Sequence, residues 1–127
     1  KIVGGVDYKY VSADNSISTT STTYTDMANM SITVTLPKCI ALLLSVTWLD
    51  TATGGASECR VAFYIDTVYK GYFTGAESGK KIVVANMHVE SLAAGSHTFK
   101  LRWRTDAAGN TSYSHERRLA VLYWYVT

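Results

Sequence analysis

Residues 91–125 read SLAAGSHTFKLRWRTDAAGNTSYSHERRLAVLYWY and carry the clearest structural signal in the chain. From Phe99 to Arg104 apolar side chains alternate with basic ones, which is the period of a strand with one buried and one solvent-facing side. Asp106, Gly109 and Asn110 follow, and these residue types tolerate the positive φ of turns. The alternation then resumes in Leu119, Val121, Tyr123 and Tyr125. The stretch predicts two strands that pair as a hairpin with a longer excursion at its tip.

The same two-residue period indicates strands elsewhere, at residues 1–11, 30–36, 40–49, 58–69 and 82–92. Residues 40–49 are almost continuously apolar, which fits a strand covered on both sides or one that faces a subunit interface as well as a core. A helix is the competing interpretation of that segment. Lys70-Gly71 predicts a tight turn, and residues 51–57 and 75–80 predict a reversal and a flexible loop. The Ser/Thr-rich residues 12–26 predict a loop or a short edge strand.

Length and composition favour one β-rich domain. The chain has 127 residues, of which 47% are hydrophobic, enough for one core. Thr, Val and Tyr are abundant and fit the pleated surface of a sheet. About eight short strands must bury their apolar faces against one another. We therefore expect an all-β fold, an antiparallel two-sheet jelly-roll sandwich over residues 1–127, with residues 1–11 as a possible extended or exchanged N-terminal strand.

Net charge and hydropathy limit the kinds of partner that the protein is expected to bind. The net charge of +2 is too small to predict nucleic-acid binding, and the longest apolar run, residues 39–46, is too short for a membrane-spanning helix. The chain begins at Lys1 rather than Met, so we expect a leader, a tag or a longer parent polypeptide to have been removed. Cys39 and Cys59 would lie far apart in a hairpin, which favours two free, buried thiols, although another topology would permit a disulfide.

No pattern in the sequence points to catalysis or to a cofactor. A GxSxG elbow, an HExxH helix and a phosphate loop are all missing from it, so we expect a non-enzymatic protein with no catalytic residues. His88, His97 and His115 lack the paired spacing of metal ligands, so no metal site is predicted. His97, which follows Gly95-Ser96, is expected to close its turn through a side-chain hydrogen bond.

Surface aromatics and arginines are the candidate binding residues. Both faces of the last strand carry rings, and Tyr and Trp are enriched in interfaces because they bury area while keeping a polar group available. We therefore predict a subunit interface at Trp48, Tyr123, Trp124 and Tyr125, with sugar stacking as the alternative. A second candidate ligand site combines Arg102 and Arg104 with Asp106 and Asn110, where basic side chains would hold a phosphate or an acidic glycan.

Two segments resemble a known class of proteins. STTYTD at residues 21–26 followed by MSITV at 30–34, and LAAGSHTFKLRWR at 92–104, resemble phage and prophage virion proteins. These are tail-fibre, head-fibre and capsid-surface modules with a jelly roll like that of tumour necrosis factor and the complement globular heads. The resemblance spans the chain from about residue 20 onward. It implies a trimeric structural module displayed on a virion surface, and it supplies no catalytic residues.

Three functional hypotheses follow. The first is a structural module on a virion or fibre that self-associates as a homo-oligomer, a trimer, and contacts other virion proteins or surface glycans. The second is a subunit of an extracellular filament in which Val6, Tyr8 and Tyr10 enter a neighbour's sheet by strand exchange. The third is a carbohydrate-binding or adhesive module. All three place the protein on a virion surface or outside the cell.

Overall fold

The computed structural model describes residues 2–52, 58–75 and 81–126, and in these it contains strands and no helix. The strands are β1 (Ile2–Ala13), β2 (Ile17–Thr19), β3 (Thr25–Leu36), β4 (Cys39–Ala52), β5 (Cys59–Ile65), β6 (Val68–Gly75), β7 (Ile82–Leu92), β8 (Gly95–Thr105) and β9 (Thr111–Val126). The predicted reversal at 51–57 and loop at 75–80 fall largely outside the described residues. The short β2 confirms the predicted edge strand within residues 12–26.

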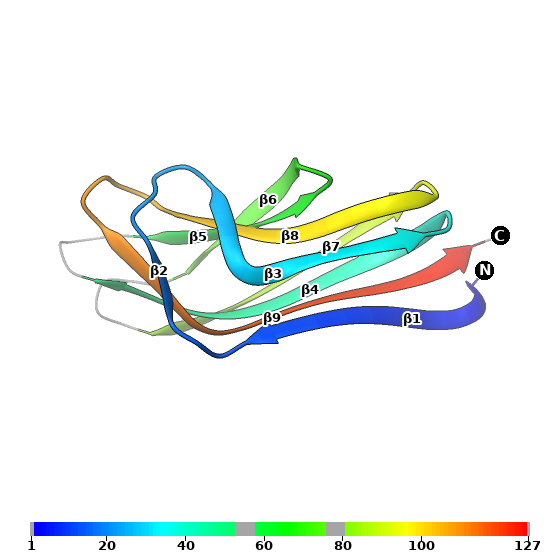
Figure 1. Cartoon of the computed structure of the whole chain (residues 1–127), viewed down its shortest axis with the longest axis horizontal. Coiled ribbons are helices and arrows are strands. Elements are labelled where there is room, and N and C mark those ends of the chain that lie inside the picture. Colours follow the sequence, from blue (N-terminus) through cyan, green and yellow to red (C-terminus); the bar gives the residue numbers. More distant parts are fainter. Residues whose placement is uncertain (1, 53–57, 76–80, 127) are drawn as a thin grey trace.

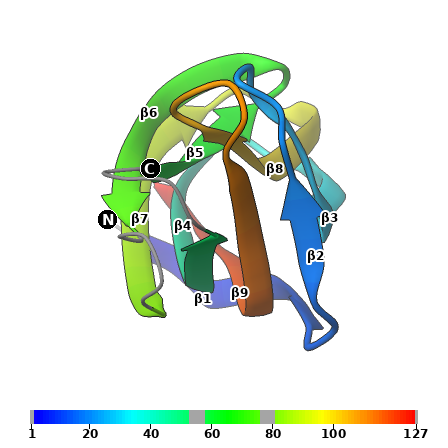
Figure 2. The ribbon, with the colours of Figure 1, turned by 90° about the vertical axis from the view of Figure 1, so that its left-hand side faces the viewer.

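The strands form two antiparallel sheets packed face to face (Figure 1). The five-stranded sheet has the order β1-β9-β4-β7, with β2 pairing to β9 beyond β1, and the four-stranded sheet has the order β3-β8-β5-β6. From β3 onward the chain crosses between the sheets at every connection except β5–β6, which is the arrangement of a jelly roll. Figure 2 looks along the strands and shows the two layers facing each other. The predicted all-β jelly-roll sandwich is confirmed.

The predicted hairpin of residues 91–125 is wrong. β8 pairs with β3 and β5, whereas β9 pairs with β1, β2 and β4, so the two strands lie in different sheets. Their apolar sides contribute to the same core, Phe99 and Leu101 from β8 and Leu119 and Val121 from β9, all fully buried. A two-residue period shows that one face of a strand is buried but not which strand lies beside it. The connection around Gly109 crosses from one sheet to the other, a distance of about 10 Å.

The turn between β5 and β6 also differs from the prediction. It lies at Asp66 and Thr67, whose φ angles are 50° and 71°. These positive angles are typical of a two-residue hairpin turn whose two central residues are both left-handed. The predicted turn residues Lys70 and Gly71 instead lie inside β6. Gly71 has a φ of 102°, a conformation that favours glycine, and the β5–β6 register shifts nearby, between Ala62 and Tyr64.

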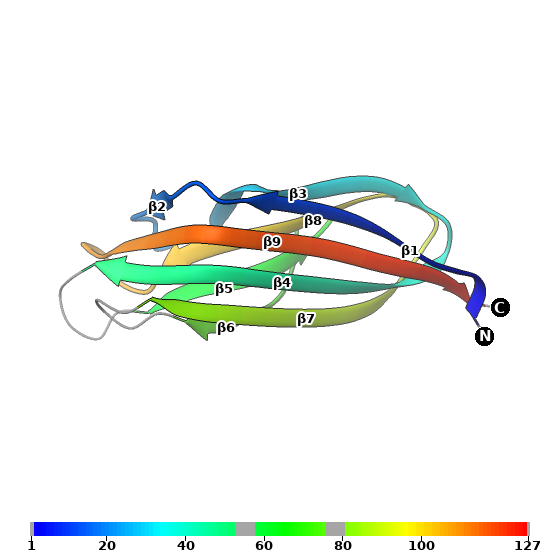
Figure 3. The ribbon, with the colours of Figure 1, turned by 90° about the horizontal axis from the view of Figure 1, so that it is seen from below.

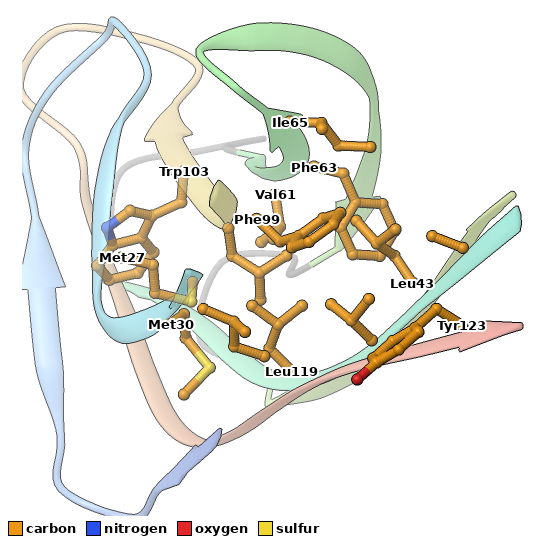
Figure 4. Packing of buried hydrophobic residues seen from close by; sticks show 14 of the residues in the cluster. Met27, Met30, Leu43, Val61, Phe63, Ile65, Phe99, Trp103, Leu119 and Tyr123 are labelled. Atoms are coloured by element: carbon orange, nitrogen blue, oxygen red, sulfur yellow. The ribbon is translucent and has the colours of Figure 1, made fainter. Parts of the chain in front are cut away.

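The core fills the space between the sheets (Figure 4). Its buried members come from β3, β4, β5, β8 and β9 among others, and they include Met27, Met30, Leu43, Val61, Phe63, Ile65, Phe99, Trp103, Leu119 and Tyr123. Cys39 and Cys59 are also buried and unbonded, as favoured from the sequence. Cys39 begins β4 in one sheet and Cys59 begins β5 in the other. Burial raises the pKa of Cys59 to about 12, so its thiol stays protonated at neutral pH.

A fully buried arginine joins three segments where the β4–β9 register shifts between Thr47 and Leu49. Arg117 has no exposed surface, and its guanidinium donates to the carbonyl oxygen of Asn15 at 2.6 Å, the Asn15 Oδ1 at 3.0 Å and the carbonyl of Ala28 at 2.9 Å. A fourth bond reaches the carbonyl of His115 at 2.9 Å. Burial lowers the pKa of Arg117 from its ordinary value. The charge is therefore held by neutral oxygens that fix the β1–β2 loop and β3 against β9.

His97 closes its turn as predicted. Its Nε2 lies 2.7 Å from the carbonyl oxygen of Ala93, and its Nδ1 lies 2.5 Å from Asp66 Oδ2 in the β5–β6 turn. Asp66 also accepts a bond from the backbone N–H of Thr98 at 2.8 Å. The hydrogen bond to Ala93, followed by the one to Asp66, raises the pKa of His97. The imidazole, which has an acceptor oxygen at each ring nitrogen, thus links two turns at the same end of the sandwich.

Candidate functional site

Figure 3 shows the five-stranded sheet from its outer side. Most side chains on this side are apolar. Register places its side chains in the cross-strand rows Val6–Trp124–Ile40–Ser91, Tyr8–Leu122–Leu42–Val89, Tyr10–Ala120–Leu44–Met87 and Ser12–Arg118–Val46–Ala85, with Trp48 beside Val83 at one end. We call this surface, from Val6 on β1 to Val89 on β7, the apolar face. Arg118 is the charged residue within the four rows. Tyr8 is 66% exposed and Met87 62%, so nothing in the described structure covers them.

Strand β7 shows most clearly that the outer side of this sheet is apolar. Its outward side chains are Val83, Ala85, Met87 and Val89, and all four are exposed. The side chains on its inner side include Asn86, which is buried, and His88 and Glu90, which are half-buried. Glu90 accepts from Lys70 at 2.8 Å and lies 3.3 Å from His88 Nε2. A strand of an isolated sandwich is expected to place its polar side chains in water. β7 departs from this pattern, because its solvent-facing side is apolar, while its inner side carries Asn86, His88 and Glu90 beside the buried Val84 and Leu92.

A shallow hollow of about 200 Å³ marks one end of the apolar face, lined by Val46, Trp48, Val83, Glu116 and Arg118. The Trp48 ring lies 5.3 Å from the Lys81 ammonium and 6.0 Å from the His115 ring. Arg118 donates to Asp14 at 2.8 Å. This end therefore combines an apolar floor with one acidic and one basic side chain at its border.

The four predicted interface residues occupy different environments. Trp48 and Trp124 are half-buried members of the apolar face. Tyr125, near the end of β9, is 42% exposed. Tyr123 is only 7% exposed and packs in the core, with its hydroxyl donating to Asp7 Oδ2 at 3.0 Å. Burial, followed by that bond, raises the pKa of Tyr123. The structure thus brings the two tryptophans to one surface and places Tyr123 inside.

Strand β1, the predicted exchange strand, lies in its own sheet. It pairs with β9 of the same chain from Ile2 opposite Val126 to Ala13 opposite Arg117, with an irregularity between Val3 and Val6. Val6, Tyr8 and Tyr10 point outward and are more than half exposed. They extend the apolar face to the edge of the sheet.

The outer side of the four-stranded sheet has a different character. Three tyrosines, Tyr24, Tyr64 and Tyr69, meet with ring centroids 5.7–5.9 Å apart. Guanidinium groups lie over the rings: Arg102 at 4.7 Å from Tyr64, Arg104 at 5.9 Å from Tyr24, and Arg60 at 4.8 Å from Tyr72. We call this surface, made of Tyr24, Arg60, Tyr64, Tyr69, Tyr72, Lys100, Arg102 and Arg104, the Tyr–Arg face. Burial, followed by the neighbouring Tyr69, raises the pKa of Tyr24.

Two carboxylates accompany the four cations of this face. Asp26 accepts from Lys100 and from Arg102 Nε, each at 2.8 Å, and the first of these bonds, acting against burial, holds the pKa of Asp26 below its ordinary value. Glu58 lies 3.5 Å from Arg60. Arg104 has no carboxylate within ion-pair distance among the described residues. Its Nε donates to the carbonyl of Thr105 at 3.2 Å.

The predicted ligand site is therefore split. Arg102 and Arg104 lie on the Tyr–Arg face, whereas Asp106 and Asn110 lie in the β8–β9 connection, where Asn110 Nδ2 donates to Asp106 Oδ1 at 3.4 Å. Sequence reasoning missed the tyrosines: Tyr24 precedes β3 and Tyr64 lies in β5, and no local motif joins them. It also missed the polarity of β7, although the alternation of Met87 and Val89 with His88 and Glu90 was a readable signal.

The three histidines lie in separate environments, and within the described ranges no three His, Cys, Asp or Glu side chains gather as metal ligands do. His88 contacts Glu90, His97 contacts Asp66, and His115 Nδ1 lies 2.9 Å from the Ser16 hydroxyl. The described chain contains no helix that is long and apolar enough to cross a membrane.

Comparison with known proteins identifies the fold. No protein-family model matches the sequence, and no curated protein matches it. Among solved structures, the chain is similar to the infectious bursal disease virus Gx strain (TM-score 0.65, 13% identity, 94% of this chain and 32% of that one) and to the VP2 subviral particle of the same virus (0.63, 13%, 94% and 33%).

A third similar structure is the CBM36-1 domain of a multidomain xylanase from the hindgut metagenome of Trinervitermes trinervoides, with a TM-score of 0.51 and 12% identity. The alignment covers 89% of this chain and 96% of that domain. The chain spans about a third of the length of the viral chains. At these identities the likeness establishes a β-sandwich fold shared by viral and carbohydrate-binding proteins.

Proposed function

We propose that this protein is a non-enzymatic structural module that self-associates through the apolar face. The observation that carries the proposal is the apolar outer side of β7, where Val83, Met87 and Val89 are each more than half exposed. Exposed apolar surface is unfavourable in water at about 25 cal/mol per Å². We propose a second copy of the chain as the partner that covers this face, since each copy supplies the same face and the contact can form without another protein.

The size of the face fits such contacts. From Ile40 to Trp48 it extends about 26 Å at 3.3 Å per residue, and four strands make it about 19 Å wide. One copy therefore offers about 500 Å² of flat area, and two stacked copies bury about 1,000 Å² in total. This area, which leaves out the added surface of protruding side chains, reaches the lower limit of specific interfaces. Sheets stack face to face about 10 Å apart, so the interface would resemble a second sandwich between subunits.

The likeness to viral structures supports a structural role on a virion surface or outside the cell. The viral neighbour is described as a subviral particle, and a jelly roll with one apolar outer face suits a subunit that packs against its like. A trimer or larger assembly would add contacts at the Trp48 hollow or at Tyr125. The finer assignment to a tail fibre or head fibre rests on the sequence resemblance.

The test is the mass of the assembly by light scattering over a range of protein concentrations. The wild type is expected to form a discrete oligomer. Met87→Lys and Leu44→Lys, which lie in one row of the apolar face, are expected to shift it to monomer with an unchanged circular dichroism spectrum. Thr35→Lys, at an exposed position of β3 in the other sheet, is the matched control and should leave the mass unchanged. A wild type that stays monomeric, or lysine variants that keep the oligomer, would refute the proposal.

Strand exchange through β1 remains the alternative mode of self-association. It would replace the β1–β9 pairing within one chain by the same pairing between neighbours. Removing residues 1–11 would then abolish long polymers, whereas stacking through β4 and β7 would survive the deletion as a discrete oligomer. Electron microscopy of both proteins separates the two modes.

A further inference from the structure

The Tyr–Arg face has features that core packing does not explain. Tyr69 and Tyr72 are 45% and 43% exposed, yet each belongs to a cluster in which rings and guanidinium groups are already arranged against one another. Residues from β5, β6 and β8, together with Tyr24, contribute to it. Side chains that hold each other in place lose little further freedom on binding, so such a surface is preorganised for a ligand.

The charges on this face are incompletely matched. Four cationic side chains, Arg60, Lys100, Arg102 and Arg104, face the two carboxylates of Asp26 and Glu58. Within the described part of the chain, Arg104 has no carboxylate partner and the buried Nε of Arg60 has no acceptor. Planar guanidinium groups match carboxylates through paired hydrogen bonds. The geometry therefore favours a ligand with carboxylate groups.

The neighbouring groups favour a sugar over a nucleic acid. Exposed tyrosine rings provide apolar area with a polar hydroxyl, and the hydroxyls of Thr33 and Thr98, 3.0 Å apart, border the face beyond Lys100. Asp26 and Glu58 can accept hydrogen bonds from sugar hydroxyls. The two carboxylates leave this face an excess of two cations, which suits a ligand less densely charged than a phosphate backbone with one charge per about 3.4 Å of each strand.

We propose that the Tyr–Arg face binds an acidic polysaccharide, with Arg104 and Arg60 pairing to its carboxylates and Tyr69 and Tyr72 contacting its sugar rings. This site lies on the opposite side of the sandwich from the apolar face and does not depend on the self-association proposed above. It also differs from the ligand site expected from sequence, because Asp106 and Asn110 take no part in it.

Calorimetric titration with an oligogalacturonate tests the proposal, and its fully methyl-esterified form is the matched uncharged ligand. The wild type is expected to bind the free acid, more weakly as salt is added, and the ester at least about tenfold more weakly. Arg104→Gln and Tyr69→Ala should each weaken binding by about tenfold. Lys38→Gln, an exposed cation between β3 and β4, should bind like the wild type.

Three results would overturn the inference. They are no binding of the free acid, equal binding of the acid and its ester, and tighter binding of a single-stranded oligothymidylate than of the oligogalacturonate. Circular dichroism of each variant checks its folding, and a double variant, Arg60→Gln with Arg104→Gln, keeps the test decisive if Tyr69→Ala does not fold. These outcomes are separate from the light-scattering test of self-association.

Discussion

Replacing the buried Arg117 should destabilise the fold far more than replacing its neighbour Arg118. In Arg117→Leu, the guanidinium and its four hydrogen bonds are lost, and the carbonyl oxygens of Asn15 and Ala28 lose their donor. Hydrogen bonds to a charged group contribute about 1.5–3 kcal/mol each. Removing a buried charge recovers part of this, because burial already disfavours the charged form of Arg117, as its lowered pKa shows. We expect a net loss of about 3 kcal/mol.

Arg118→Leu is the matched control. Its side chain is 37% exposed and pairs with Asp14, which is 73% exposed, and exposed ion pairs contribute about 0–1 kcal/mol. Guanidinium denaturation followed by circular dichroism gives the free energy of unfolding of both variants. Arg117→Lys is expected to recover little, since one ammonium cannot reach Asn15 and Ala28 in the same geometry. Equal losses for Arg117→Leu and Arg118→Leu would refute the view that Arg117 fastens these segments.

Two further predictions concern the turns. Thr67→Gly should stabilise the protein by about 1 kcal/mol, since Thr67 is β-branched and has a φ of 71°, a left-handed conformation that strains non-glycine residues. His97→Gln should destabilise it in a pH-dependent way. The raised pKa of His97 means that its contribution is complete below its unfolded pKa of about 6.5 and is lost as the pH rises through the folded value. The difference between the wild type and His97→Gln in thermal unfolding should therefore be larger at pH about 6 than at pH about 9.

Each turn prediction has its own check. Thr35→Gly, in the extended β3, should destabilise rather than stabilise, and a loss at Thr67→Gly similar to that at Thr35→Gly would contradict the strain argument. At low pH the ionisation of Asp66, the partner of His97, also affects stability. Burial raises its pKa, but its bonds to the Thr98 N–H and to His97 hold it below its ordinary value, so its contribution is lost as the pH falls through that lowered value. A pH-independent effect of His97→Gln would contradict the charged link.

The strands were predictable because each carries its own periodic signal. Met30, Ile32 and Leu36 on β3 are buried, as their alternation indicated. Strand partners were not predictable, because the same alternation is satisfied by any neighbour, and β8 and β9 therefore appeared to be a hairpin. The β5–β6 turn was misplaced because Asp66-Thr67 lacks the glycine that usually marks left-handed residues.

The candidate sites were harder to predict than the strands, because they combine residues that are distant in the sequence. Trp48 and Trp124 were identified from their residue type, but Tyr123 alternates in step with the buried Val121 and joins the core. In β7 the alternation of Met87 and Val89 with His88 and Glu90 was readable in the sequence, but only the sheet order shows that Met87 faces out and Asn86 faces in. The cluster of Tyr24 with Tyr64 and Tyr69 exists because β3, β5 and β6 lie in one sheet.

The two outer faces of the sandwich divide the surface between two kinds of interaction. A five-stranded sheet with an apolar exterior is suited to contact with another sheet, whereas the four-stranded sheet has aromatic rings fixed by guanidinium groups and a local excess of positive charge. Stacking two copies through their apolar faces would leave both Tyr–Arg faces pointing outward on opposite sides. Self-association would then double the number of ligand sites without covering either, and because the two faces point in opposite directions, each would bind its own polymer chain. The apolar outer side of β7 and the arginines of β8 would thus serve one arrangement: an assembly that links two acidic polymer chains through its two outward-facing Tyr–Arg faces.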